Sequence, residues 1–155
     1  MERKIISFMM TGVLLLSLPT TAFAAANNEY PTDILSAYIE ERASKYLDGY
    51  SVGVDTRGNG TIAVAMNVDG IGIMDKIGVL EVEIWYKENG VWKYEDSLYG
   101  AEHPEFYEYN SRDYIGTTYF QGTPGVTYQV VLRVYAENST GSDTGEVTSP
   151  EIVCK

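Results

Sequence analysis

The stretch "VTYQVVLRVYAEN", residues 126–138, alternates apolar and polar side chains with a period of two. Successive side chains of a β-strand point to opposite faces, so such a pattern predicts a strand with one buried face. The side chains expected to point inward are those of Tyr128, Val130, Leu132, Val134 and Ala136.

The same period recurs on both sides of this stretch. "YSVGVDT" (50–56) and "TIAVAMNVDG" (61–70) flank the turn "RGNG", which predicts a hairpin. In 79–87, Leu80, Val82, Ile84 and Tyr86 share one face, and Val79, Glu81, Glu83, Trp85 and Lys87 share the other. "YIGTTYFQG" (114–122) and "EVTSPEIVC" (146–154) are further strands, and Pro150 restricts the latter to an edge or a bulge. About seven short strands separated by turns, without an internal repeat, predict one antiparallel, two-sheet β-sandwich over residues 50–155.

The turn at residues 88–90 allows two registers. With a two-residue Asn-Gly turn, Trp85 pairs with Tyr94, whereas a three-residue loop pairs Tyr86 with Trp92. We expect the second register, because it places apolar side chains opposite one another, and a slip of one residue would reverse the face. It makes Trp92 a core aromatic.

Two segments lack the strand period. Residues 96–113 read as a long connection. Residues 27–49 form a lead-in with helical apolar spacing, for which we expect a short helix up to about Ser44. The alternative ends the helix near Ala43 and starts an edge strand at Tyr46.

The first 26 residues predict a cleaved secretory signal peptide. A basic head precedes an apolar run over 5–18, and the small-residue pattern Ala22-Phe23-Ala24 follows. The run is shorter than the roughly 20 residues of a spanning helix. "LPTT" (18–21) lacks the Gly and the C-terminal position of a wall-sorting signal, and no cysteine near the cut site could carry a lipid. We expect a secreted, extracellular protein without membrane insertion.

Charge narrows the range of partners. The chain has 22 Asp plus Glu against 11 Lys plus Arg, a net charge of −11. Nucleic acids and anionic membranes bind through Lys and Arg at phosphates, so both are excluded as expected partners. Thirteen tyrosines favour a sheet and also suit a binding surface.

"GTPGVTYQVVLRVYAENSTGSD" (122–143) resembles the penultimate-strand signature of fibronectin type III and related immunoglobulin-like modules, although 128–136 is two residues longer than the usual pattern. A second resemblance covers most of residues 42–150. "GNG" (58–60), "MDKIG" (74–78), a Trp after a hairpin and "YAENSTGSD" (135–143) are similar to an uncharacterised family of small secreted Gram-positive bacterial proteins. This resemblance implies export and a β-sandwich, and it implies no activity.

No residue pattern indicates catalysis or a cofactor. Nucleophilic catalysis requires a nucleophile beside a base, and the chain has a single histidine, His103, with no nucleophile-elbow motif. A hydrolase with two carboxylates would need a defined spacing and a cleft. We therefore expect a non-catalytic binding or interaction module. The alternative is a structural, self-associating secreted protein, with a carboxylate-based hydrolase as a distant third.

Loops at 69–77, 96–113 and 138–145 should emerge at the same end of such a sandwich. Acidic residues there, among them Asp69, Asp75 and Asp143, are the candidate ligands for Ca²⁺, which prefers six to eight oxygens. The alternative is that Asp75 and Asp143 cap turns.

The same end gathers aromatic side chains suited to a glycan or an extended segment of an extracellular protein. The candidate contact residues are Tyr99, His103, Phe106, Tyr107 and Tyr109; alternatively, these rings pack under the loop. Cys154, the only cysteine, could link two chains or lie buried on the last strand.

Overall fold

The computed structural model describes residues 44–155, so the expected signal peptide and the expected helix before Ser44 lie outside the described residues. The described chain forms seven strands and one short 3₁₀ turn. These are β1 (Leu47–Gly58), β2 (Thr61–Glu88), β3 (Val91–Tyr99), η2 (Pro104–Phe106), β4 (Tyr107–Gln121), β5 (Thr127–Asn138), β6 (Gly141–Thr148) and β7 (Ile152–Val153).

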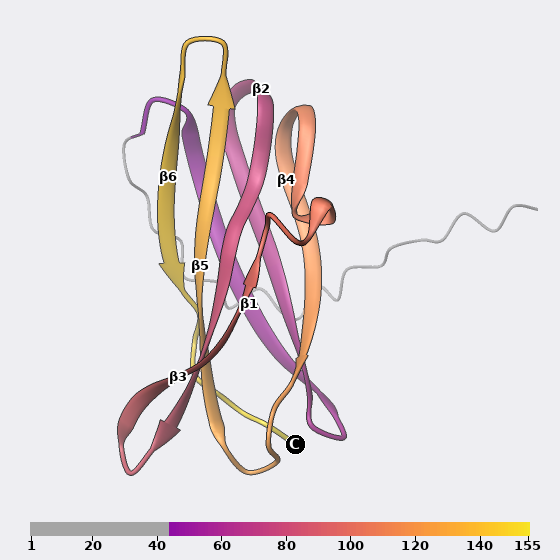
Figure 1. Ribbon diagram of the computed structural model, residues 1–155, viewed down its shortest axis with the longest axis vertical. Coiled ribbons are helices and arrows are strands. Elements are labelled where there is room, and N and C mark those ends of the chain that lie inside the picture. Colours follow the sequence, from indigo (N-terminus) through magenta and orange to yellow (C-terminus); the bar gives the residue numbers. More distant parts are fainter. Residues whose placement is uncertain (1–43) are drawn as a thin grey trace, which may run out of the picture. The chain divides into compact units, whose positions relative to one another are not determined.

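β2 is the spine of the fold, and it belongs to two layers (Figure 1). Its first half pairs with β1 on one side and β4 on the other, as in Val54 opposite Val64 and Val64 opposite Thr118. Its second half pairs with β3 and β5, and β5 continues to β6 and β7. Because β2 reverses direction around residues 70–73, the two layers β1–β2–β4 and β3–β2–β5–β6 face each other. This arrangement confirms an all-β, antiparallel, sandwich-like fold.

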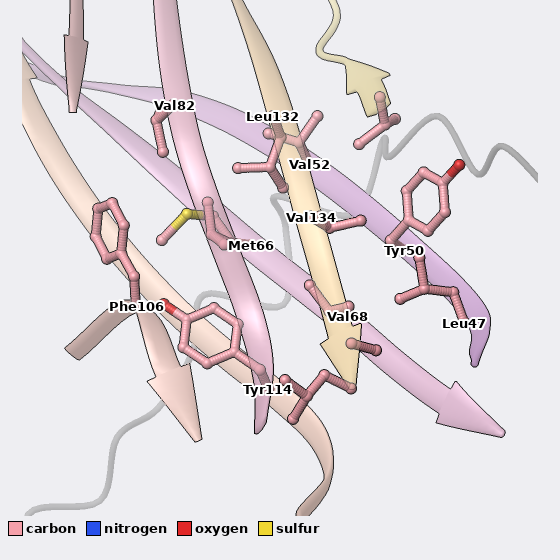
Figure 2. Close-up of a cluster of buried hydrophobic side chains, with 14 of the residues drawn as sticks. Leu47, Tyr50, Val52, Met66, Val68, Val82, Phe106, Tyr114, Leu132 and Val134 are labelled. Carbon is pink, nitrogen blue, oxygen red and sulfur yellow. The ribbon is translucent and has the colours of Figure 1, made fainter. Parts of the chain in front are cut away.

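The core lies between the two layers (Figure 2). Val52 and Met66 from one layer pack in the same buried cluster as Val82 and Leu132 from the other. All five residues predicted to point inward from 128–136 are buried. Each fully buried Val or Leu side chain contributes roughly 1.5–3 kcal/mol relative to exposure, so alternation on β2 and β5 accounts for much of the fold's stability.

The expected long connection over 96–113 is wrong for most of its length. β3 continues to Tyr99 and β4 begins at Tyr107, so only residues 100–106 connect them. β4 follows the bend of β2, pairing over 107–111 with its second half and over 113–121 with its first half. The segment 107–113 lies at the margin of the sandwich, where both sides of a strand meet water, and it therefore shows no apolar alternation.

A bulge in β2 reverses the side-chain alternation near Leu80. The pairing with β5 shifts between Val79 and Glu81, and Val79, expected to point outward, is fully buried. One extra residue in a strand turns the residues before it to the opposite face. The prediction holds from Glu81 onward and is wrong for Val79. Leu80, expected on the inward face, is the extra residue of the bulge and is only half-buried.

The β2–β3 hairpin has the register that we did not expect. Asn89 and Gly90 form a two-residue turn with φ of 52° and 79°, and Trp85 pairs with Tyr94. Trp92 lies opposite Lys87 on the outer side of the sheet, so its prediction as a core aromatic is wrong. The mirror-image turn available to Asn-Gly matches strand twist, and this local preference outweighs the pairing of apolar residues.

The start of the described sandwich fits one of the two expected alternatives, whereas its end differs from the prediction, because the single strand expected over 146–154 is split into β6 and β7. β1 begins at Leu47, inside the expected lead-in, as in the alternative with a strand starting near Tyr46. Pro150 lies between β6 and β7, where no ladder hydrogen bond is required of it. Within residues 44–155, no helix has the length and apolarity needed to span a bilayer.

Candidate functional site

The outer face of the β3–β2–β5–β6 layer, together with the first residues of β4, carries a set of rings that we call the aromatic face. Its members are Trp85, Trp92, Tyr94, Tyr99, Tyr107, Tyr109 and Tyr135. The other outer face is built differently: at its centre, Gly53 of β1, Ala65 of β2 and Thr117 of β4 lie side by side. Among residues 44–155, Tyr119 is the one ring on that other face.

The lower part of the aromatic face is formed by β2 and β3. Trp85 and Tyr94 meet edge to face, with ring centroids 5.7 Å apart. The Lys87 ammonium lies 5.1 Å from the centre of the Trp92 ring. Tyr94 and Tyr99 are 50% and 46% exposed, so these rings present area to solvent while their neighbours hold them in place.

The upper part surrounds Lys76. Its ammonium lies 3.7 Å from the centre of the Tyr107 ring and 5.9 Å from that of Tyr135, both within cation–π range. Gly78 lies opposite both tyrosines in the two ladders and has no side chain to separate them. Tyr109, opposite Lys76, is 61% exposed.

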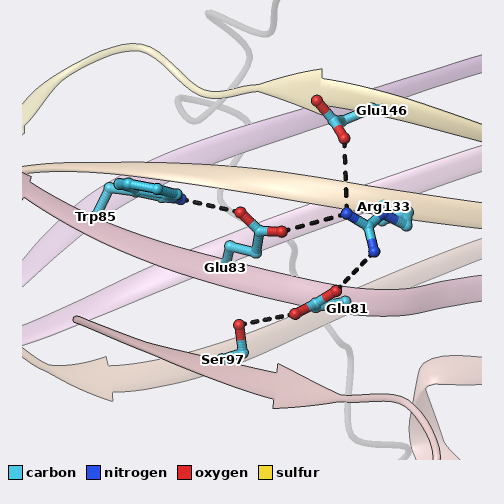
Figure 3. Close-up of polar contacts among 6 residues, drawn as sticks. All are labelled: Glu81, Glu83, Trp85, Ser97, Arg133 and Glu146. Carbon is cyan, nitrogen blue, oxygen red and sulfur yellow. Dashed lines mark hydrogen bonds and ion pairs between the residues drawn. The ribbon is translucent and has the colours of Figure 1, made fainter. Parts of the chain in front are cut away.

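A polar network fixes the layer beneath the lower rings (Figure 3). Arg133 of β5 donates to Glu81 at 3.0 Å and to Glu83 at 3.3 Å, both on β2. Glu146 of β6 adds a weaker ion pair at 3.9 Å.

The two β2 carboxylates extend this network to the neighbouring side chains. Ser97 Oγ donates to Glu81 at 2.9 Å, and the indole N–H of Trp85 donates to Glu83 at 3.1 Å. Both oxygens of each carboxylate are therefore engaged. The network holds the Trp85 ring in one orientation, which lowers the entropy that it would lose on contacting a ligand.

Three tyrosines of the aromatic face are held in their neutral form. Burial raises the pKa of Tyr107, and the hydrogen bond to Glu137 raises the pKa of Tyr135. For Tyr99, the hydrogen bond with Ser97 lowers the pKa, but the charges of Tyr94 and Glu81 outweigh it and the pKa is raised overall. Their hydroxyl groups therefore stay protonated well above neutral pH, and that of Tyr135 donates its proton to Glu137.

The structure separates the five candidate contact residues. Tyr99, Tyr107 and Tyr109 lie on the aromatic face, away from a loop tip. Phe106 is 1% exposed and belongs to the core, and His103 stacks on it at 4.8 Å while contacting Glu105. The hydrogen bond from His103 lowers the pKa of Glu105.

Sequence reasoning missed four rings of this face, namely Trp85, Trp92, Tyr94 and Tyr135. A signal was present for Trp85, which alternates with the buried Val82 and Ile84 and was expected to point outward. For Trp92 and Tyr94 the signal depended on the hairpin register, which was predicted incorrectly. The bend of β2 and the β5–β6 turn lie at the same end of the sandwich, whereas the 3₁₀ turn of the β3–β4 connection lies away from that end, beside β4 (Figure 1).

The three candidate calcium ligands have separate local environments. Asp143 accepts hydrogen bonds from Ser44 Oγ and from the backbone N–H groups of Lys45 and Tyr46, so it caps the start of β1. Asp69 accepts from the Asn67 side-chain amide at 2.8 Å, and Asp75 is exposed. Over the described range 44–155, no three His, Cys, Asp or Glu side chains are grouped so that they could hold a metal ion.

Cys154 is buried, in agreement with the second of its two alternatives. It is 1% exposed and its thiol lies 3.5 Å from the carbonyl oxygen of Gly60. A disulfide to another chain would therefore require the C-terminal segment to leave its site.

Three comparisons with known proteins give the same result. A scan against protein-family models, a search of curated proteins and a search of solved structures each return no match for the chain.

Proposed function

We propose that this chain is a secreted, non-catalytic binding module that holds an extracellular glycan on its aromatic face. The observation that carries the proposal is the gathering of seven rings on one outer face, when the opposite outer face has small side chains at its centre. Core packing and sheet propensity act on both faces alike, so they do not account for this asymmetry. The signal-peptide pattern in residues 1–26 supports export.

The chemistry of the face suits a sugar chain. Sugar rings have apolar C–H faces that pack on aromatic rings, and hydroxyl groups at their edges that need donors and acceptors. Tyr94, Tyr99 and Tyr109 offer both an exposed ring and a hydroxyl group. Tyr and Trp provide such contact area at a low cost in side-chain entropy.

The two carboxylates on the aromatic face have a structural role. Glu81 and Glu83 share Arg133 and hydrogen-bond to Ser97 and Trp85, so they orient rings. This use of both carboxylates favours binding over an acid–base pair, which would need one oxygen directed at a scissile bond.

The test is calorimetric titration of the purified protein with two neutral oligosaccharides, cellohexaose and chitohexaose, beside a pull-down on purified peptidoglycan. We expect saturable binding to at least one of these probes. Replacing a stacking ring removes roughly 1–2 kcal/mol of contact energy, so Trp92→Ala and Tyr94→Ala should each weaken binding about 10-fold.

The matched control is Ile73→Ala. Ile73 is 66% exposed at the bend of β2, outside the aromatic face, so its truncation should leave the affinity unchanged. Thermal melts of all three variants separate lost binding from lost folding. The proposal is wrong if no probe binds, or if the ring variants bind as tightly as the unmodified chain. Saturable binding of a cationic decapeptide in place of the sugars would assign the face to a protein partner.

A further inference from the structure

The lateral edges of the two layers differ in how they are protected. Unpaired edge strands expose backbone donors and acceptors, and proteins shield them with charges, bulges or proline. β3 carries Lys93, Glu95 and Asp96 together with a register shift, and β6 carries Asp143 and Glu146. Both of these edges therefore resist pairing with another strand.

β4 lacks these protective features from Tyr114 to Gln121, which we call its lower half. It pairs with β2 on one side, and the described residues provide no strand on its other side. From Tyr114 to Gln121, "YIGTTYFQ", it contains no charge, no proline and no register shift. In a chain with a net charge of −11, this uncharged edge of eight residues repels a second copy less than the charged edges of β3 and β6 do.

The sequence of this edge is complementary to itself. In an antiparallel pair of two β4 strands centred on Thr117, Ile115 of each strand faces Tyr119 of the other. Ile115 and Tyr119 are 51% and 58% exposed, so the pairing would cover two apolar side chains on each strand. Asp113 would face Gln121, so no two like charges meet. Shifting the centre by one residue in either direction loses the Ile115–Tyr119 pair.

We propose that two copies of this chain pair through their β4 edges, with a two-fold axis at Thr117. The two three-stranded layers β1–β2–β4 then form one continuous six-stranded sheet. Such an isologous interface uses the same edge of both partners, so the assembly closes as a dimer and does not grow into a fibre. Cross-strand apolar pairs contribute in addition to the backbone ladder.

The test is sedimentation equilibrium of the purified protein over a concentration series reaching roughly 10⁻⁴ M. We expect the mass to rise from that of one chain to that of two and then to remain constant. Thr117 faces its own symmetry mate, so Thr117→Asp and Thr117→Lys each place like charges opposite one another. Each should weaken the dimer by roughly 100-fold, because apposed like charges cost several kcal/mol.

A mixture of the two charged variants provides the decisive test of this interface. Equal amounts of T117D and T117K should restore a dimer, because Asp and Lys then face each other across the axis. Thr144→Asp is the control: it adds the same charge to an exposed position on β6 and should leave the dimer unchanged. Circular dichroism melts show that each variant is folded. A single-chain mass for the unmodified protein at every concentration overturns the proposal, and so does a T117D and T117K mixture that stays monomeric.

Discussion

At the level of single residues, Asp143 fastens the beginning of the described sandwich to its β5–β6 hairpin. One carboxylate oxygen accepts from Ser44 Oγ, from the Lys45 N–H at 3.0 Å and from the Tyr46 N–H at 3.2 Å. The hydrogen bond from Ser44 is the largest cause that lowers the pKa of Asp143, followed among the lowering causes by the backbone N–H groups. The ionised carboxylate is thus the form that the fold prefers.

This preference predicts a pH dependence of stability. Because the folded-state pKa of Asp143 lies below its ordinary value of 3.8, the stabilisation is present above about pH 4 and is lost as pH falls through the folded-state pKa. Asp143→Asn should therefore lower the melting temperature at pH 7, and the difference from the unmodified chain should shrink towards pH 3. Melting curves across this range check it. The exposed Asp75→Asn is the control, and a difference for D143N that does not change with pH would contradict the assignment.

Single residues also show how much of the candidate site could be predicted from the sequence. Tyr99, Tyr107 and Tyr109 were found because aromatic residues in a segment without a period draw attention to it. Their placement on a sheet face was not foreseen, because residues 107–111 pair with the second half of β2 at a margin where neither side is apolar. Phe106 lies in the same segment as Tyr107 and Tyr109 but is buried in the core, and no local sequence pattern indicates this difference in burial.

At the level of elements, the alternation of apolar and polar residues identified the strands. The single extra residue at each bulge could not be recognised in the sequence. The β5 pattern succeeds because its inner face is buried along its whole length. The shifts near Leu80 in β2 and Glu95 in β3 each add a single residue, which changes neither composition nor local propensity. A bulge of this kind reverses one segment of a strand, and for that reason Val79 was predicted incorrectly. The hairpin register was predicted incorrectly for a different reason, the two-residue turn at Asn89 and Gly90.

The turn of the β2–β3 hairpin offers a direct test of what its backbone conformation contributes to stability. Gly90 adopts a φ of 79°, a conformation that costs residues with a Cβ roughly 1–2 kcal/mol. Gly90→Ala should lower the free energy of unfolding by about that amount, although open space surrounds the position. Urea unfolding followed by tryptophan fluorescence measures this change.

Gly72→Ala, at the bend of β2, is the matched control for this substitution. Gly72 also lies in open space, but its φ is outside the left-handed region, so the change should be within about 0.5 kcal/mol. Equal losses for the two variants would mean that backbone conformation at Gly90 does not set the cost.

At the level of the whole sandwich, the two proposals use different surfaces. The aromatic face belongs to the β3–β2–β5–β6 layer and the upper part of β4, whereas the dimer edge is the lower part of β4 in the other layer. Pairing of two chains along residues 114–121 would therefore leave both aromatic faces open. A dimer with two open faces would bind a long glycan at two points, which strengthens attachment without any new contact.

The shared spine predicts that both layers unfold as one unit. β2 contributes its first half to one layer and its second half to the other, and the core cluster contains Met66 and Val82 from these two halves. Neither layer can open without exposing the apolar face of the other. In native-state hydrogen exchange read by mass spectrometry, segments 62–68 and 81–86 should therefore exchange with the same free energy, equal to that of global unfolding. Exchange of either segment at a clearly lower free energy would show that the layers open separately, with β2 acting as a hinge between two independent sheets.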